Sequence, residues 1–294
     1  MSDWTPDMVI YHHPCQDGMG AALAAWLRWR DAIFVPSNYG DTPPNVAGLN
    51  VLIVDFSYKR AELEAMGLLA ASIVILDHHK TAAADLEPFR RFADKPERFT
   101  LPTITLMIAD LQRGSYPVIL ACFDMERSGA MMTWNFAHPG KPAPELIEAI
   151  QDRDLWRFHR PHSEAIATFL RTMPHELTSW AALLEVPFAQ LARDAAMMLT
   201  YHRALIEMVA KNAESDTIDD VAAVRVNCPY FLASDVGNLL LDRQPDVVAA
   251  LWTDGNGWRH WSLRSRDDRP DVSAIASKFG GGGHRNSAGF RTPL

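Results

Sequence analysis

Three short apolar runs near the start of the chain each lead directly into polar side chains that can bind a metal. The runs cover residues 8–11, 51–54 and 73–76. Short runs rich in β-branched residues and bounded by polar positions are typical of buried parallel strands. In open α/β sheets, ligands bind at the carboxyl ends of such strands. We therefore expect the residues after the three runs to meet at one edge of a parallel sheet.

The residues that follow these runs are carboxylates, imidazoles and one thiol. They are His12, His13, Cys15 and Asp17 after the first run, Asp55 after the second, and Asp77, His78 and His79 after the third. Carboxylates gathered at one place would repel one another unless bound cations offset their charge. The pattern therefore predicts a dinuclear metal site across three adjacent strand ends.

The rest of the pattern predicts an α/β protein of two domains. A parallel-sheet domain is expected over residues 1–185, a connecting helix over 186–213, and a smaller α/β domain over 214–294. The connecting helix is predicted from apolar residues at helical spacing. We expect the active cleft to lie between the two domains.

Composition narrows the class of protein. A chain of 294 residues with 48% hydrophobic residues can form two packed cores. No apolar run approaches the ~18 residues of a membrane span, and the first residues do not resemble a signal peptide. Three cysteines without Cys-x-x-Cys spacing argue against a disulfide framework. We expect a soluble cytoplasmic protein with no membrane partner.

The net charge of −8 has a consequence for partners. A protein that binds long nucleic acids in general needs a broad basic face. That class is therefore disfavoured, whereas short nucleotide substrates are not excluded.

Five segments together resemble the DHH phosphoesterase superfamily, which includes RecJ-like exonucleases and nano-RNase oligoribonucleases. The segments are His13–Gly18, Val54-Asp55, Asp77-His78-His79, Asp154-Leu155-Trp156 and the glycine run that ends in His284. The last segment is similar to the signature of the DHH-associated C-terminal domain. Cys15 departs from the family, which usually has an aspartate at that position.

The resemblance implies two metal ions bridged by Asp55. The first would be held by His13, the position of Cys15, and Asp55; the second would be held by Asp17, Asp55, His78 and Asp154. Asp77 would bind a metal or orient a ligand, and His79 would orient His78 or touch phosphate. His12 is expected to point away. Asp152 competes with Asp154, and Cys15 is either a ligand or a buried thiol.

Mixed oxygen and imidazole ligands favour two Mn²⁺ ions, with Mg²⁺ as the alternative. The implied catalytic residues are Asp77, His78, His79 and His284.

The C-terminal glycine run predicts a phosphate-binding loop, because glycines let backbone N–H groups approach an anion closely. Gly281, Gly282 and Gly283 would form this loop, with His284 beside it. Strand-like alternation over residues 258–265 leaves Arg264 opposite the core face, and the resemblance makes it the first candidate for phosphate. Arg285 is the second candidate. Ser128 is expected to be a helix N-cap first and a phosphate contact second.

These observations predict a metal-dependent phosphodiesterase that hydrolyses short oligonucleotides by a two-metal mechanism. A phosphatase of nucleoside bisphosphates and a cyclic-dinucleotide phosphodiesterase are the alternative enzymes. The alternative of another class is a nucleotide-binding regulator whose catalysis has decayed at Cys15. The sequence leaves monomer and homodimer open.

Overall fold

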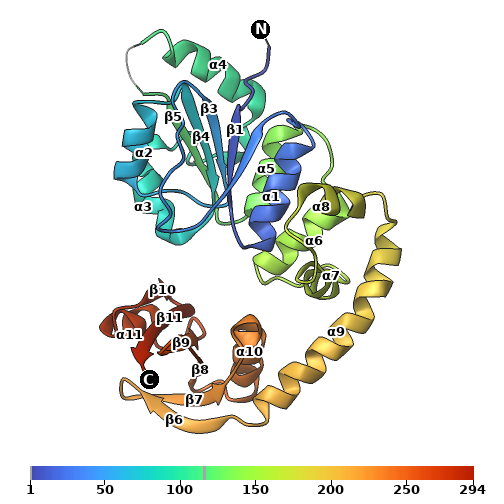
Figure 1. The fold of residues 1–294 in the computed structure, drawn as a ribbon, viewed down its shortest axis with the longest axis vertical. Coiled ribbons are helices and arrows are strands. Elements are labelled where there is room, and N and C mark those ends of the chain that lie inside the picture. The colour runs from blue at the N-terminus through green and yellow to red at the C-terminus, as the bar shows by residue number, and fades with distance from the viewer. Residues whose placement is uncertain (1, 115–116) are drawn as a thin grey trace. The chain divides into compact units, whose positions relative to one another are not determined.

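The computed structural model describes residues 2–114 and 117–294. The chain divides into two compact units, Met1–Leu199 and Thr200–Leu294. The division falls within the long helix α9 (Phe188–Ala210), which leads from one unit to the next (Figure 1). No helix in the described residues is both long enough and apolar enough to cross a membrane.

In the described part of the N-terminal unit, five strands form one sheet, and every pair of neighbours is parallel. The order is β2-β1-β3-β4-β5. The strands are β1 (Met8–His12), β2 (Ile33–Ser37), β3 (Asn50–Val54), β4 (Ser72–Asp77) and β5 (Ile119–Phe123). The three apolar runs are therefore adjacent parallel strands, and the predicted α/β class is confirmed.

The register explains why the three polar clusters lie level with one another. Tyr11 pairs with Val54, and Val54 pairs with Leu76. The next residue of each strand or strand end is thus His12, Asp55 or Asp77. Three equal apolar runs place three candidate ligands in one row.

Helices cover both faces of this sheet. Figure 1 shows α1 and α5 on one side, and α2 and α3 on the other. Because side chains alternate along a strand, Val9 and Leu52 pack in the first core, while Ile10 and Ile53 pack in the second. The α-helices of this unit before α9 are α1 (Gln16–Trp26), α2 (Arg60–Gly67), α3 (Ala83–Leu86), α4 (Leu101–Leu111), α5 (Gly129–Ala137), α6 (Glu145–Asp154), α7 (Ser163–Leu170) and α8 (Leu177–Leu183). Short 3₁₀ turns are η1 (Lys80–Ala82), η2 (Glu87–Phe89) and η3 (Pro96–Arg98).

The C-terminal unit, all of which the structure describes, contains a mixed sheet of six strands in the order β10-β11-β9-β8-β7-β6. Only the β7–β8 pair is parallel, and α10 lies in its crossover, because parallel strands need a long connection. The elements are β6 (Glu214–Ile218), β7 (Val221–Asn227), η4 (Tyr230–Leu232), α10 (Ala233–Arg243), β8 (Val248–Gly255), β9 (Trp258–Arg264), α11 (Val272–Lys278), β10 (Gly282–His284) and β11 (Ser287–Pro293).

Candidate metal centre and C-terminal pocket

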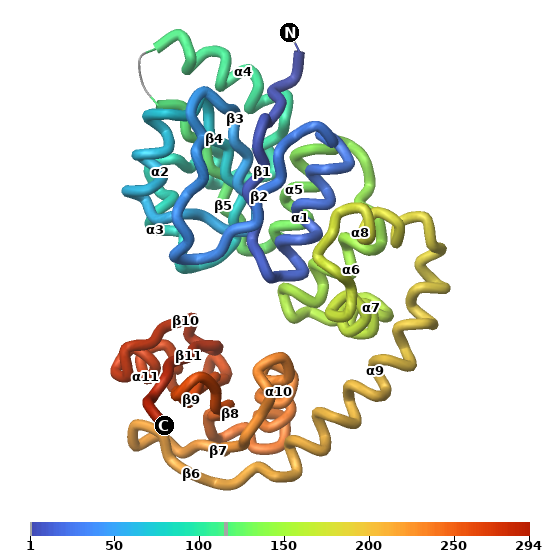
Figure 2. Tube along the Cα trace, viewed as in Figure 1, coloured from blue at the N-terminus to red at the C-terminus, as the bar shows by residue number. Residues whose placement is uncertain are grey.

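The candidate metal centre lies where the strand order of the N-terminal sheet reverses. The chain runs from β1 to the edge strand β2 and returns to β3 on the other side of β1 (Figure 2). A reversal of this kind opens a crevice at the carboxyl ends of the two central strands. His12 ends β1, and Asp55 follows β3 at that point.

Asp55 is the centre of the cluster. Its side chain is fully buried, with one oxygen 3.3 Å from Nδ1 of His12 and the other 3.2 Å from Nε2 of His78. Its backbone has a left-handed φ of 63°, which is uncommon for a residue other than glycine. The Asp55 N–H donates to the Leu76 carbonyl at 2.9 Å, so the neighbouring strand helps to hold this conformation.

Two further carboxylates approach the same histidine. One carboxylate oxygen of Asp17 and one of Asp154 each lie 3.6 Å from Nε2 of His78. Asp17 also accepts hydrogen bonds from the N–H groups of Gly129, at 2.6 Å, and Ala130, at 3.0 Å. These donors belong to the first turn of α5, where free N–H groups and the helix dipole stabilise an anion.

Asp77 positions both histidines that follow it. Its Oδ1 accepts from the N–H groups of His78, at 2.8 Å, and His79, at 3.1 Å, and lies 2.9 Å from Nδ1 of His79. Its Oδ2 is buried and has no hydrogen-bond partner among the described residues. A buried carboxylate oxygen without a donor has a free acceptor position, which a cation would satisfy.

The cluster strongly perturbs its own pKa values. Burial would lower the pKa of His78, but the hydrogen bond to Asp55 and the charges of Asp17 and Asp154 raise it to about 10. Burial raises the pKa of Asp17 and of Asp154, and neighbouring carboxylates add to both shifts. Burial acts in the same direction on Asp55, but hydrogen bonds from His12 and His78 outweigh it and lower its pKa. Asp55, at the centre of the cluster, is therefore the carboxylate that most readily loses its proton.

The donor set fits divalent cations. Two groups of candidate ligands share Asp55. One group adds His12 and His79, and the other adds Asp17 and His78. Within each group the ligand atoms lie within 4.8 Å of one another. Carboxylate oxygens and imidazole nitrogens suit Mn²⁺, and an oxygen-rich group suits Mg²⁺. Together with the free oxygen of Asp77, this arrangement can accommodate two ions that share one carboxylate.

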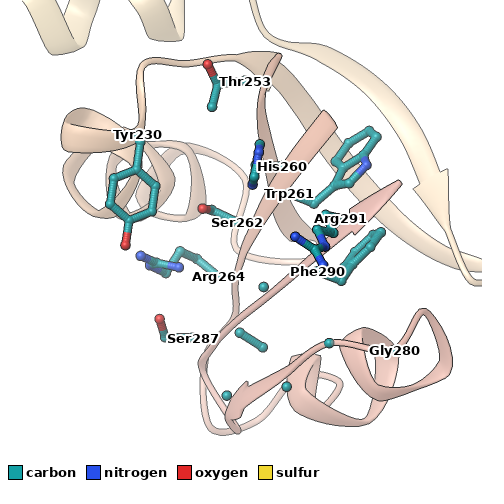
Figure 3. A pocket seen from close by; sticks show the side chains of 15 residues that line it. Tyr230, Thr253, His260, Trp261, Ser262, Arg264, Gly280, Ser287, Phe290 and Arg291 are labelled. Atoms are coloured by element: carbon teal, nitrogen blue, oxygen red, sulfur yellow. The ribbon is translucent and has the colours of Figure 1, made fainter. Parts of the chain in front are cut away.

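The C-terminal unit contains a separate cavity of about 730 Å³. Figure 3 shows that Arg264, His260 and Arg291 reach it, together with Tyr230 and the hydroxyl of Ser287. The backbone of residues 280–283 forms one part of the wall, and Thr253, Trp261, Ser262 and residues 288–290 complete it. Cationic side chains, hydroxyls and exposed main-chain amides together suit an anionic ligand.

No protein-family model matches the chain. An uncharacterized protein, R106 of Acanthamoeba polyphaga mimivirus, is 29% identical over a stretch that covers 97% of this chain and 67% of the relative.

Solved structures that match nearly the whole chain include a phosphodiesterase and a RecJ protein. The pGpG-specific phosphodiesterase PggH from Vibrio cholerae is 13% identical, with a TM-score of 0.49, over 98% of this chain and 94% of its own. RecJ from Thermus thermophilus, in complex with Mn²⁺, is 14% identical, with a TM-score of 0.47, over 96% of this chain and 49% of its own. These neighbours are members of the DHH superfamily. At such identities and TM-scores the likeness assigns no activity to this chain.

The structure places His12, and not His13, against Asp55. The His13 ring instead faces the ring of His175, with 4.8 Å between centroids. Neighbouring residues at a strand end point to opposite sides, so only one of the two histidines can face the cluster. Aligning the ends of the three apolar runs would have selected His12, because that alignment is the observed register.

Cys15 lies among the carboxylates but outside the two groups described above. It is the N-cap residue of α1. Burial raises the pKa of its thiol well above the usual range, and the charges of Asp55, Asp17 and Asp154 raise it further. The protein by itself therefore keeps this thiol protonated, and a metal would have to displace the proton to bind sulfur.

Of the two downstream acids, the structure brings Asp154 to the cluster. Asp152 is buried elsewhere, where it accepts hydrogen bonds from the N–H groups of His159 and Arg160, both at 2.9 Å. The expectation that the second acid would be a solvated charge at the end of the helix is therefore wrong, because Asp152 binds the loop that follows α6.

Some of the remaining predicted residues line the C-terminal pocket, and others have structural roles. Arg264 lines the cavity and donates to Ser234 Oγ at 2.9 Å, whereas Arg285 donates to the carbonyls of Asp267 and Arg269. Ser128 is the buried N-cap of α5. His284 ends β10 and pairs with Ser287 in the sheet, outside the residues that line the cavity. Gly281, Gly282 and Gly283 all line it.

Proposed function

We propose that this protein is a metal-dependent phosphoesterase of the DHH superfamily that hydrolyses short oligonucleotides or related nucleotide phosphodiesters. The observation that carries the proposal is the sharing of Asp55 by two groups of candidate ligands. Two-metal phosphoesterases need one ligand to bridge ions ~3.5–4 Å apart. Asp55 is buried, and its two oxygens face different histidines, which suits a bridging role.

We assign one ion to His12, Asp55 and His79, with the free oxygen of Asp77 beside them. The other is assigned to Asp17, Asp55 and His78, with Asp154 as the fourth ligand. Cys15 would be an additional ligand if its thiol lost its proton, and the acids that raise its pKa, Asp55, Asp17 and Asp154, are those assigned to the second ion. When bound, Mn²⁺ or Mg²⁺ would neutralise charge on the phosphoryl oxygens and activate a water for attack.

The protein's own residues prepare this chemistry. Asp77 holds the backbone of His78 and His79 and the ring of His79 through three contacts to one oxygen, and Asp55 holds the ring of His78, so both histidines need little reorganisation on binding. The first turn of α5 neutralises part of the charge of Asp17. Preorganised ligands of this kind supply the positioning on which phosphoryl transfer depends.

The C-terminal pocket supports a nucleotide as the substrate. Arg264, His260 and Arg291 offer donors to a phosphate group, and Tyr230 offers a flat apolar surface at the same cavity. Its volume of about 730 Å³ is within the range of small-molecule sites. We propose that this pocket binds a phosphate group of the substrate, through Arg264 and the main chain of the glycine run.

Turnover in the presence of Mn²⁺ tests the proposal. The substrates are a 5′-phosphorylated dinucleotide, a longer RNA, a cyclic dinucleotide and a nucleoside bisphosphate, and the dinucleotide is expected to be hydrolysed fastest. His78→Ala should abolish hydrolysis of every substrate because it removes a ligand. Unchanged activity in this variant would refute the metal centre, and tight binding without any turnover would favour the regulator.

A matched pair of variants tests the assignment of His12. The two neighbouring histidines differ in whether they face Asp55. His12→Ala should lose turnover, whereas His13→Ala should retain it. The opposite result would restore the assignment to His13 that the sequence resemblance implies.

A further inference from the structure

The loop between α6 and α7 is held in an unusual backbone conformation. Trp156, Phe158 and His162 have φ values of 55°, 50° and 75°. L-residues with side chains rarely adopt this left-handed region. Three such residues within seven positions mean that the surroundings fix the path of the loop against its local preference.

Asp152 is the residue that fixes this path. Its carboxylate accepts the N–H groups of His159 and Arg160 at 2.9 Å and the Ser163 hydroxyl at 2.6 Å. Its main-chain carbonyl accepts the Arg157 N–H, also at 2.9 Å. The side chain is only 5% exposed, so these bonds are shielded from water. The loop is therefore a rigid structure built on a buried anion.

This rigid loop presents two aromatic rings to solvent. Trp156 is 37% exposed and Phe158 is 38% exposed, and their rings meet edge to face with 5.1 Å between centroids. The Arg153 guanidinium lies 4.0 Å from the centroid of the Trp156 ring. A flat indole backed by a cation and held at the surface is suited to stacking with another flat group.

The rings follow a candidate metal ligand closely in the chain. Trp156 is two residues beyond Asp154, so their Cα atoms are at most about 7.6 Å apart. The carboxylate of Asp154 is in turn 3.6 Å from Nε2 of His78. We take this proximity to bring a group stacked on Trp156 within one nucleotide of a phosphate at the metal centre.

We propose that Trp156, supported by Phe158, is a stacking platform for a base of the substrate whose phosphodiester is cleaved. This inference rests on the proposed phosphodiesterase function and adds a specificity-determining residue to it. Stacking on an aromatic ring tolerates any base, because every base has a π-face. The platform would thus favour nucleotide phosphodiesters over phosphoesters that carry no base, without selecting a sequence.

The test compares two substrates with and without bases. One is a 5′-phosphorylated diadenylate, and the other is the same dinucleotide with both bases absent. Trp156→Leu should raise KM for the first by about tenfold and leave KM for the second unchanged. Trp156→Phe retains a flat ring and should restore most of the lost affinity. Because uniform binding is removed, kcat should change little.

Trp26 provides a matched control. The Arg30 guanidinium covers its ring at 4.4 Å, as Arg153 covers Trp156. Trp26 ends α1, ten residues beyond Gln16, which places it about 15 Å along the helix axis from the cluster. Trp26→Leu should therefore leave the KM ratio of the two substrates unchanged.

The outcomes separate the two proposals. If the wild-type protein hydrolyses neither substrate, the phosphodiesterase function fails, and the platform fails with it. If wild type is active and Trp156→Leu shows the wild-type KM for diadenylate, only the platform is refuted, and the exposed rings would then serve contact with another macromolecule. An equal loss with both substrates would also refute it, because Trp156 would then act only by holding Asp154.

Discussion

At the scale of single residues, the close approach of Gly129 to Asp55 is a tight constraint on the candidate metal centre. A Cβ at position 129 would lie 2.5 Å from both Cβ and Oδ1 of Asp55. Asp55 cannot move away easily, because its two oxygens are bonded to His12 and His78. The absence of a side chain at one position therefore defines where the shared carboxylate lies.

Gly129→Ala should displace Asp55 and reduce turnover roughly a hundredfold, since misplacing a catalytic group by about 1 Å can cost that much. Steady-state kinetics in Mn²⁺ would measure the loss. Gly255→Ala is the control, because a Cβ there meets nothing within 4 Å. If both variants behave like wild type, the Asp55 carboxylate tolerates movement and is not the shared ligand.

At the residue scale, the sequence predicted the types of candidate ligand but not all of their contacts. The types of side chain and their positions after three strands were readable, because buried runs end abruptly at polar residues. The choice between His12 and His13 depended on which side of the strand end each residue faces and on the register of the neighbouring strands. Sequence spacing shows this register only after the strands have been aligned with one another. The buried role of Asp152 was not readable, because its partners are backbone N–H groups of an irregular loop.

At the scale of elements, the strands with continuous apolar runs were predicted and the half-exposed edge strand was not. β2 has Ile33 at 56% exposure and contains Pro36. Its pattern carries no clear period, because an edge strand buries only part of its surface and tolerates proline. Pairing with β1 determines this strand more than its own residues do.

The packing of α5 against α1 depends on a neutral histidine. His138, at the C-terminal end of α5, donates from Nε2 to the Ala24 carbonyl of α1 at 3.0 Å. Burial lowers the pKa of His138; the Ala24 carbonyl opposes this, and the charges of Lys141 and Arg28 add to the lowering. The folded protein thus takes up a proton here less readily than the unfolded chain.

This shift predicts a pH dependence of stability. The contribution of His138 is fully present above the ordinary histidine pKa of about 6.5 and is lost as the pH falls from there through the folded pKa. His138→Gln keeps an N–H donor but does not titrate. The difference in the free energy of unfolding between wild type and variant, measured in urea, should fall between pH 7.5 and pH 5. A constant difference would show that His138 is not neutral in the fold.

At the scale of the whole molecule, several acidic side chains are buried together at one place. The chain carries a net charge of −8, and Asp17, Asp55 and Asp77 are all buried. Burying several carboxylates together is costly unless cations compensate them. The stability of the molecule should therefore depend on divalent ions.

Mn²⁺ should raise the melting temperature in calorimetry, and excess chelator should reverse the rise. At a hundred times its Kd, a ligand that binds only the folded state adds about 2.7 kcal/mol to the free energy of unfolding. Asp55→Asn should remove most of this effect, because it weakens both groups of ligands. An equal Mn²⁺ shift in wild type and variant would place the ions elsewhere.

Cys15→Asp extends the same measurement. Magnesium prefers oxygen to sulfur, so an oxygen at this position should increase the shift caused by Mg²⁺ more than that caused by Mn²⁺. No increase for either ion would mean that the thiol does not face a metal.

The glycine wall of the C-terminal pocket limits how this protein can diversify. An added methyl group at Gly281 would meet the main-chain oxygen of Gly289 at 2.1 Å, and at Gly283 it would meet the Cα of Ala288 at 2.5 Å. No change of rotamer relieves a clash with backbone. New ligand preferences are therefore expected to arise at other lining positions, such as Tyr230, His260 and Gly282, where an added Cβ meets nothing within 4 Å. Gly281 and Gly283 are thus constrained by the neighbouring backbone, whereas other positions in the pocket can accept new side chains.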